Sequence, residues 1–240
     1  MKLAFTILIA LTCQSLASPA EVNKSLRDDG LYSGEEDVLD MDEIDSISIM
    51  DFVGPITPGG PNVTLSGTAK EIYKQILELN PSYSVWDFDE YADDLEARGL
   101  TPEDIDVTNP SLKIRSSVMA ELHGRDNELV PRDSFNCNIG SYVGNVWSQC
   151  GEGFGYLWNL GKAWCGAKAK SCARVSCSHN CGMYLCSKLS KEKKVHCGNI
   201  ANDMVKIAYE CGSDVTTWAY RARGQMQFSC HNTKLSSPSC

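Results

Sequence analysis

The chain has 240 residues and a formal net charge of −9, but its charge and its cysteines are unevenly distributed. Residues 18–132 hold 25 acidic and 9 basic side chains and no cysteine, whereas residues 133–240 hold 12 basic and 6 acidic side chains and 11 of the 12 cysteines. That cysteine density is typical of small secreted domains stabilised by disulfides. After the N-terminal residues no run reaches the roughly 18 apolar residues of a membrane span, so we expect no membrane anchor.

The first residues have the features of a secretory signal peptide. Met1-Lys2 gives a basic start, residues 3–11 are mostly apolar, and Ser15-Leu16-Ala17 places small residues where signal peptidase reads the chain. We therefore expect residues 1–17 to be a signal peptide that is cleaved after Ala17. The protein is then secreted and extracellular.

The acidic part begins with a segment that we expect to be largely disordered, over residues 18–65. Its low hydrophobicity and many carboxylates disfavour a packed core. Residues 51–61 contain three prolines and the pair Gly59-Gly60, and this composition predicts a linker. N-glycosylation sequons begin at Asn23 and at Asn62.

Helices are predicted over residues 66–110. Thr68 and Glu71 form a capping box before apolar residues at helical spacing, and Asn80-Pro81 ends this first helix. A second helix is predicted over residues 87–98. We expect a small helical unit with an acidic outer surface.

Pro131-Arg132 marks a candidate processing site, because charge and cysteine content both change within a few residues of it. A kexin-type secretory protease needs an arginine in an exposed, extended chain, and proline disfavours helix there. We therefore expect residues 18–132 to be an acidic pro-region that holds the basic part by complementary charge until cleavage after Arg132. Arg115 is a second candidate. An uncut linker to a permanent N-terminal domain is the alternative interpretation.

The cysteine-rich part, residues 133–240, is predicted to contain two helices. Apolar spacing places one over residues 154–164 and the other over residues 200–211, with Gly212 as its stop and Cys211 on its buried face. A disulfide at Cys211 would fix the end of that helix.

Strands are predicted in the same part. Alternating polarity indicates a strand over residues 225–230, with residues 215–221 as its partner and residues 183–186 as another short strand. The expected fold is α+β: a small disulfide-rich domain of two helices on a short antiparallel sheet, preceded by the partly disordered, partly helical acidic pro-region.

Disulfides are the expected state of the cysteines in a secreted chain, and the spacing from Cys172 to Cys186 does not match paired zinc ligands. No metal or other cofactor is expected. The candidate disulfide cysteines are Cys137, Cys150, Cys165, Cys172, Cys177, Cys181, Cys186, Cys197, Cys211, Cys230 and Cys240. Eleven cysteines leave one over, which is available for a disulfide-linked dimer.

The order of residues in the cysteine-rich part is similar to that of a known family. Ser171-Cys172-Ala173-Arg174-Val175-Ser176-Cys177-Ser178 is followed by an apolar strand ending in Cys186, a helix ending in Cys211, Gly224-Gln225 and a terminal Cys240. This pattern over residues 165–240 resembles small secreted cysteine-rich proteins of filamentous fungi, which are discussed as candidate effectors or killer-toxin-like proteins. The resemblance implies secretion, a disulfide-stabilised α+β domain and antagonism toward another cell, and it carries no active site. Cys181 departs from the pattern and is a candidate for the unpaired cysteine.

Basic residues near aromatic ones indicate an acidic partner. The candidate anion-binding residues are Lys162, Lys168, Lys170 and Arg174, which lie near Trp158 and Trp164, and the run Lys191, Lys193 and Lys194. Charge of this kind suits an anionic cell surface, a cell-wall polymer or a receptor of a target cell. The leading hypothesis is therefore a secreted, non-enzymatic toxin- or effector-like protein.

Two other functions stay open from the residues alone. A secreted ribonuclease would use the histidines of the basic part, His179, His196 and His231, for acid–base chemistry. A structural cell-wall protein would use the odd cysteine to link chains.

Overall fold

The computed structural model of the protein describes residues 47–107, 134–216 and 219–237, and all of them belong to one compact unit, Leu39–Cys240. The helices are α1 (Ala69–Leu79), α2 (Asp89–Ala97), α4 (Val146–Gln149), α5 (Gly151–Asn159) and α6 (Cys197–Cys211), with short 3-10 turns η2 (Val85–Asp87) and η3 (Pro102–Asp104). The strands are β1 (Ile47–Pro55), β2 (Asn62–Gly67), β3 (Ser134–Asn136), β4 (Trp164–Ala167), β5 (Cys172–Ser178), β6 (Cys181–Ser187), β7 (Lys193–His196), β8 (Gly212–Thr216), β9 (Ala219–Ala222), β10 (Gly224–Gln227) and β11 (His231–Ser236).

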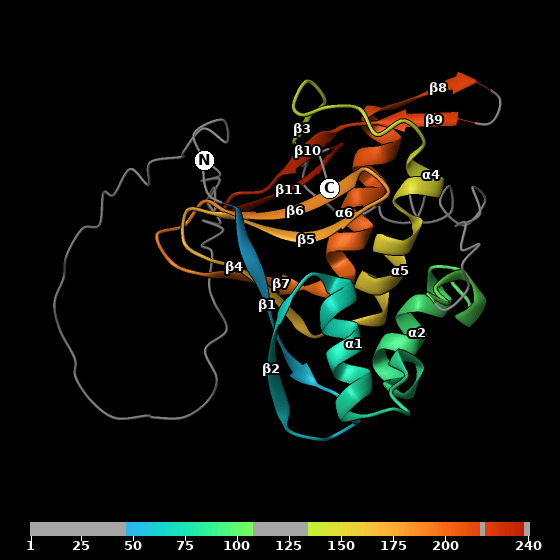
Figure 1. Ribbon diagram of the computed structural model, residues 1–240, viewed down its shortest axis with the longest axis vertical. Helices are drawn as coiled ribbons and strands as arrows, with labels where there is room; N and C mark the ends of the chain where they lie inside the picture. Colours follow the sequence, from blue (N-terminus) through green and yellow to red (C-terminus); the bar gives the residue numbers. More distant parts are fainter. Residues whose placement is uncertain (1–46, 108–133, 217–218, 238–240) are drawn as a thin grey trace, which may run out of the picture. The chain divides into compact units, whose positions relative to one another are not determined.

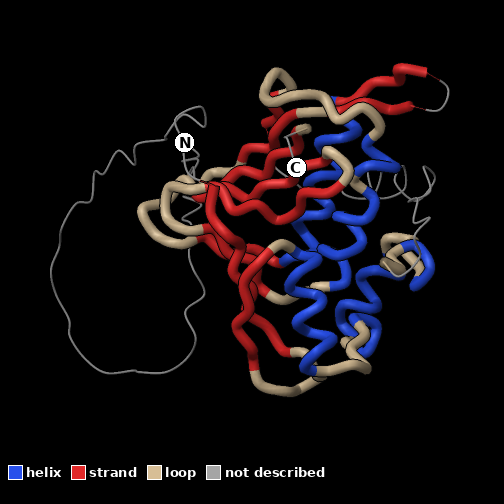
Figure 2. Tube along the Cα trace, viewed as in Figure 1, coloured by secondary structure: helices blue, strands red, loops and turns tan. Residues whose placement is uncertain are grey.

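The main sheet draws strands from both parts of the sequence. Its nine strands run in the order β3-β10-β11-β6-β5-β1-β4-β7, with β2 paired to β1. β1 is parallel to β5, while its pairings with β2 and β4 are antiparallel. Figures 1 and 2 show the strands gathered on one side and helices α1, α5 and α6 on the other. The fold is therefore a mixed α/β, disulfide-rich arrangement.

The predicted disorder and linker are wrong for the residues of the first hairpin. β1 presents Met50, Phe52 and Gly54 to the core in alternation, and residues 56–61 are the connection to β2. The prolines and glycines that suggested a linker belong to the end of β1 and to this connection, where Gly59 adopts φ +69°. The low average hydrophobicity of the segment concealed one strand with a regular apolar face.

The two helices predicted from the acidic part are confirmed. α1 begins after Thr68, whose side chain accepts from the Glu71 backbone while the Glu71 carboxylate accepts from the Thr68 backbone, and it ends at Asn80. α2 lies within the predicted range and buries Tyr91 and Leu95. The helices do not form a unit of their own, because their buried residues join the same apolar core as the cysteine-rich part.

The prediction for α6 is confirmed, and that for α5 is right only in part. α6 buries Ile200, Met204 and Ile207 and ends at Cys211. α5 ends at Asn159, because the chain then turns through Gly161 at φ +63° into β4. The residues between 160 and 164 therefore leave the helix.

The predicted partner of the C-terminal strand is wrong. β10 pairs with β11 and with β3, whereas β8 and β9 pair with each other as a separate two-stranded sheet, to which Val143 adds a single bridge at Ala222. The predicted strand over residues 183–186 is confirmed within β6. The predicted fold of two helices on a short sheet is therefore wrong in size. The main sheet has nine strands, and the acidic part supplies two of them, β1 and β2.

Disulfides connect elements of the cysteine-rich part to one another. The described bonds are Cys137–Cys211, Cys150–Cys181, Cys165–Cys197 and Cys172–Cys186. The first fixes the end of α6, as expected. Cys181 is therefore not the unpaired cysteine, and Cys177 and Cys230 are disulfide-bonded as well. Cys240 lies outside the described residues, so the disulfide-linked dimer stays a prediction.

Several disulfides are typical of secreted or extracellular proteins. In the described part of the chain, no helix has the length and apolar character needed to cross a bilayer. The processing positions Ala17, Arg115 and Arg132, and the sequon at Asn23, lie outside the described residues. Asn62 is exposed at the start of β2.

Candidate lysine-rich anion site

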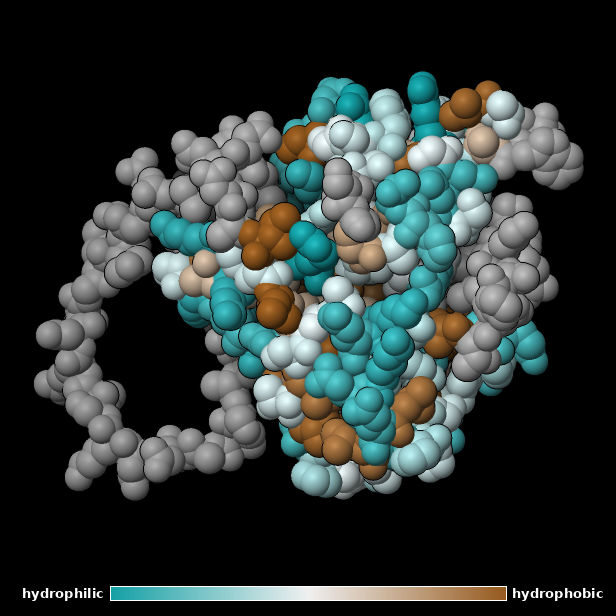
Figure 3. Space-filling view, in the orientation of Figure 1, coloured by the Kyte–Doolittle hydropathy of each residue, from teal (hydrophilic) through white to brown (hydrophobic). Residues whose placement is uncertain are grey.

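The structure brings the two predicted lysine runs to neighbouring loops. The backbone N–H of Lys170 in the β4–β5 loop donates to the carbonyl of Leu189 in the β6–β7 loop at 2.9 Å. The N–H of Ser187 donates to the carbonyl of Ser171, also at 2.9 Å. Figure 1 shows the two loops projecting together from the strand side of the molecule, and Figure 3 shows mainly hydrophilic surface there.

Side-chain hydrogen bonds also fix these loops. The Ser171 hydroxyl donates to the carbonyl of Lys168 at 3.0 Å, and the Ser187 hydroxyl donates to the carbonyl of Lys191 at 3.1 Å. Since β4 and β7 are paired, Ala167 lies opposite Lys193 and the two loops start from adjacent strands. We call the resulting group the lysine cluster: Lys168, Lys170, Lys188, Lys191, Lys193 and Lys194.

The charges of the lysine cluster are poorly balanced. Glu192 forms an ion pair with Lys194 at 3.2 Å, and no ion pair is found for Lys168, Lys170, Lys191 or Lys193 among the residues the structure describes. Burial lowers the pKa of Lys193, and the neighbouring charge of Lys191 lowers it further. Since the charge of Lys191 disfavours the charged form of Lys193, an anion bound beside these two side chains would offset that repulsion.

A half-buried edge of the cluster contains Lys188 and His231. The Lys188 ammonium donates to the carbonyl of Phe228 at 2.6 Å, and burial lowers its pKa. The His231 ring stacks on Phe228 with centroids 4.3 Å apart. Burial lowers the pKa of His231 to about 3, and the charges of Lys193 and Lys188 add to the effect. The imidazole is therefore neutral near pH 7 and adds no charge to the cluster.

Two of the predicted anion-binding residues lie elsewhere. The Lys162 ammonium sits 3.7 Å from the Glu90 carboxylate and donates to the Glu90 carbonyl at 3.1 Å. Arg174 is on β5, opposite Tyr184. Burial raises the pKa of Tyr184, and the charge and hydrogen bond of Arg174 lower it in part. Trp158 is completely buried in the core, so it takes no part in a surface.

The three candidate histidines of a nuclease lie at different places in the fold. His179 is at the turn between β5 and β6, whereas His231 is opposite Ser187 at the other end of β6. His196 ends β7, stacks on Trp164 with centroids 4.0 Å apart, and contacts the Lys162 carbonyl through Nδ1.

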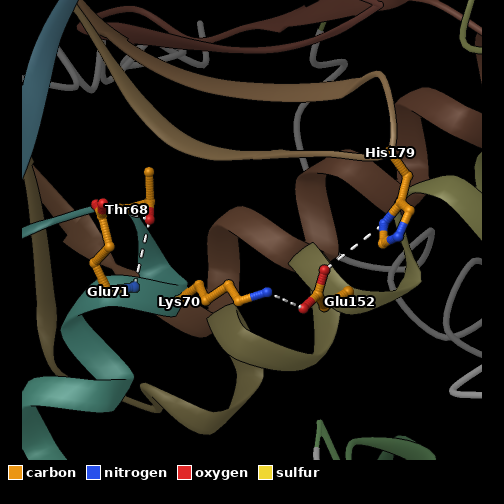
Figure 4. Close-up of polar contacts among 5 residues, drawn as sticks. All are labelled: Thr68, Lys70, Glu71, Glu152 and His179. Atoms are coloured by element: carbon orange, nitrogen blue, oxygen red, sulfur yellow. Dashed lines mark hydrogen bonds and ion pairs between the residues drawn. The ribbon is translucent and has the colours of Figure 1, made fainter. Parts of the chain in front are cut away.

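His179 is part of a small charged group with Glu152. Nδ1 of His179 lies 3.7 Å from one carboxylate oxygen of Glu152, and the Lys70 ammonium lies 2.7 Å from the other. Figure 4 shows Lys70 reaching from α1 and His179 from the strand turn toward Glu152 on α5. The hydrogen bond to Glu152 raises the pKa of Lys70. This group joins the acidic part to the cysteine-rich part.

A recess of about 430 Å³ lies where α2 and η2 approach the end of α5. Its lining includes Pro55, Phe88, Tyr91 and Leu160, with Lys162 at one side. No sequence pattern indicated it, because its residues come from three separate segments, 55–59, 83–91 and 160–163.

Sequence reasoning found most of the lysine cluster but missed its geometry. The prediction named Lys168, Lys170, Lys191, Lys193 and Lys194 as two groups, and the pairing of β4 with β7 brings the backbones of these two groups next to each other. The proximity of Phe228 and His231 to Lys188 had no local signal, because the turn between β10 and β11 that carries both rings lies about forty positions later in the chain.

Comparison of the chain with known protein-family models, with curated proteins and with solved structures gave no match.

Proposed function

We propose that this is a secreted, toxin- or effector-like binding protein whose lysine cluster contacts an anionic surface of a target cell. The carrying observation is the convergence of six lysines from two bonded loops and β7, with Glu192 as the one described carboxylate in an ion pair there. Clustered positive charge attracts anionic surfaces in a manner that weakens with salt.

The disulfides support the secreted part of this proposal. The effector-like part is supported by the cysteine order of residues 165–240, which resembles that of fungal secreted cysteine-rich proteins. Cleavage after Arg132 by a kexin-type protease remains part of the proposal, as does the signal peptide ending at Ala17.

Vesicle binding tests the function directly. The secreted protein is mixed with vesicles of phosphatidylcholine alone or with phosphatidylserine added, and bound protein is measured by co-sedimentation. We expect binding only to the anionic vesicles and its loss as sodium chloride is raised. Since each lysine near an anionic membrane contributes about 1 kcal/mol, Lys168→Gln with Lys191→Gln should weaken binding roughly 30-fold.

A matched pair of lysines outside the cluster provides the control. Lys74→Gln with Lys162→Gln removes the same charge and should leave binding within about threefold of the wild type, since long-range effects are screened. Equal losses for the two double variants would show that net charge, and not the cluster, causes binding. A soluble sulfated polysaccharide, tested in the same buffer, distinguishes a polymer from a bilayer as the surface.

A further inference from the structure

The acidic part of the chain occupies the middle of the main sheet. Ile47 to Ile49 of β1 pair in parallel with residues 172–174 of β5, and Asp51 to Val53 pair with residues 164–166 of β4. β1 therefore lies between β5 and β4 in the strand order. Without β1, the described strands of residues 134–237 would lose the pairing that joins the β3-to-β5 part of the sheet to β4 and β7.

The contacts that hold this part are largely apolar. Met50 and Phe52 of β1 are completely buried, as are Ile72 and Ile76 of α1. Figure 1 shows α1 beside α5, and these helices are in contact. All four side chains belong to the same core as Trp158 of α5.

Buried hydrogen bonds add to the apolar contacts. The Tyr83 hydroxyl donates to the Asn159 carbonyl at 2.7 Å, and the Asn159 side-chain amide donates to the Ile105 carbonyl at 2.7 Å. These bonds are buried, so salt screens them little. At the surface, the Lys162–Glu90 pair has the polarity expected of a basic and an acidic part, whereas in the shorter Lys70–Glu152 pair the acidic part supplies the lysine.

A disulfide cannot join the two parts. Between Cys13 and Cys137 the sequence has no cysteine, so residues 47–107 contribute none. If the main chain were cut between residues 107 and 134, only noncovalent contacts would link them.

We propose that residues 47–107 remain bound to residues 134–237 after such a cut, as one subunit of a two-chain protein. Hydrolysis after Arg132 consumes one water and leaves a new carboxylate on Arg132 and a new amine on Asp133, but it breaks none of the contacts described above. The product of processing is then a complex that retains β1 in its sheet. The acidic part is a permanent structural half, and its attachment depends on a buried strand more than on charge.

A controlled cut tests this. A site-specific protease sequence is inserted after residue 120 of the full chain, and the digested protein is passed over a size-exclusion column in 0.15 M and in 1 M sodium chloride. We expect both fragments to elute together, at the volume of the uncut protein, at both salt concentrations. Separate elution in 0.15 M salt would overturn the proposal. Separation in 1 M salt alone would also overturn it, since it would show attachment by charge.

Variants of β1 test the strand itself. Phe52→Ala should raise the dissociation constant of the cut fragments by at least about 100-fold, because a large buried side chain is lost. Ile49→Ala, at a position that is 63% exposed, should leave it unchanged. If Phe52→Ala does not fold, the milder Phe52→Leu should raise the constant about tenfold. Equal retention in the Phe52 and Ile49 variants would contradict the proposal. No vesicle is used, so this result is independent of the proposed function.

Discussion

Gly54 of β1 lies at a close approach to Ala163 of the cysteine-rich part. A Cβ atom placed on Gly54 would lie 2.4 Å from the Cβ of Ala163 and 3.1 Å from its Cα. Two carbon atoms cannot approach to that distance, so the close passage of the two backbones requires glycine at this position.

The contact predicts a pair of substitutions that compensate. Gly54→Ala should lower the free energy of unfolding by about 1–3 kcal/mol, because overpacking forces the backbones apart. Adding Ala163→Gly should restore most of that loss, since it removes the opposing atom. Urea denaturation of the three variants measures both effects. A Gly54→Ala protein as stable as the wild type would show that the strands separate freely at this point.

The lowered pKa of His231 predicts that the free energy of unfolding depends on pH. Its pKa is lowered to about 3 in the folded protein, whereas in an unfolded chain it is about 6.5. Between these values the unfolded state binds a proton that the folded state does not, so stability falls as the pH falls. The contribution is complete above about pH 6.5, and its loss below that approaches 1.4 kcal/mol per pH unit.

Denaturation between pH 4 and pH 7 measures this slope. His231→Phe keeps an aromatic ring against Phe228 and removes the titrating group, so its stability should fall less with acid. Lys193→Met should shift the pKa of His231 upward, which an NMR titration of the imidazole detects. An unchanged slope in His231→Phe would assign the acid sensitivity to other groups.

At the scale of elements, the capping box at the start of α1 stabilises that helix. Because α1 packs on α5, the cap also contributes to the stability of the whole protein. Thr68→Ala removes the side-chain acceptor and should lower the free energy of unfolding by about 1 kcal/mol. Thr57→Ala, an exposed threonine in the β1–β2 connection, is the control and should change it by less than 0.5 kcal/mol. Thermal or urea denaturation compares the two. Equal effects would show that the cap adds no stability.

The helices were predictable from sequence because their signals are local. Thr68 with Glu71, the apolar spacing of α6 and Gly212 after Cys211 all lie within a few residues of the element that they define. The main sheet was not predictable in the same way. β4 and β7 have four residues each, and β1 pairs with β5 across more than a hundred positions.

In the candidate site, too, the local features were predictable from the sequence and the long-range contacts were not. Each lysine run was visible as a local excess of charge, and the exposure of Lys168, Lys170 and Lys191 agrees with it. Their convergence depends on the pairing of β4 with β7 and on hydrogen bonds between loops. The tryptophans misled the prediction, because Trp158 fits an apolar core as well as it fits a binding surface.

At the scale of the whole molecule, the boundary in composition is not a boundary in structure. The acidic and basic parts share one core, and the charged side chains of α2, such as Asp89 and Glu96, are exposed. Composition reports what covers a surface, whereas the fold depends on the buried apolar face of each element. Segments with opposite surface charge can therefore belong to one folded unit.

Because the acidic and basic parts share one apolar core, we expect residues 133–240 to be unstable alone. Expressed without residues 18–132, this part would expose the edges of β5 and β4 and the apolar surface that β1 and α1 cover, so it should aggregate or form incorrect disulfides. Adding residues 18–132 as a separate chain during oxidative refolding should raise the yield of monomeric complex. Size-exclusion and disulfide mapping measure the outcome. A stable, correctly paired monomer of residues 133–240 alone would show that the acidic part is dispensable.

The place of β1 also sets the order of events during synthesis. Its residues leave the ribosome more than a hundred positions before the β4 and β5 residues with which they pair. Until most of the chain has been made, β1 therefore lacks these two pairing partners, and pairings so distant in sequence form slowly. Folding is consequently completed after synthesis, and a chain that stops before β4 and β5 would leave its first strand free to pair with other chains.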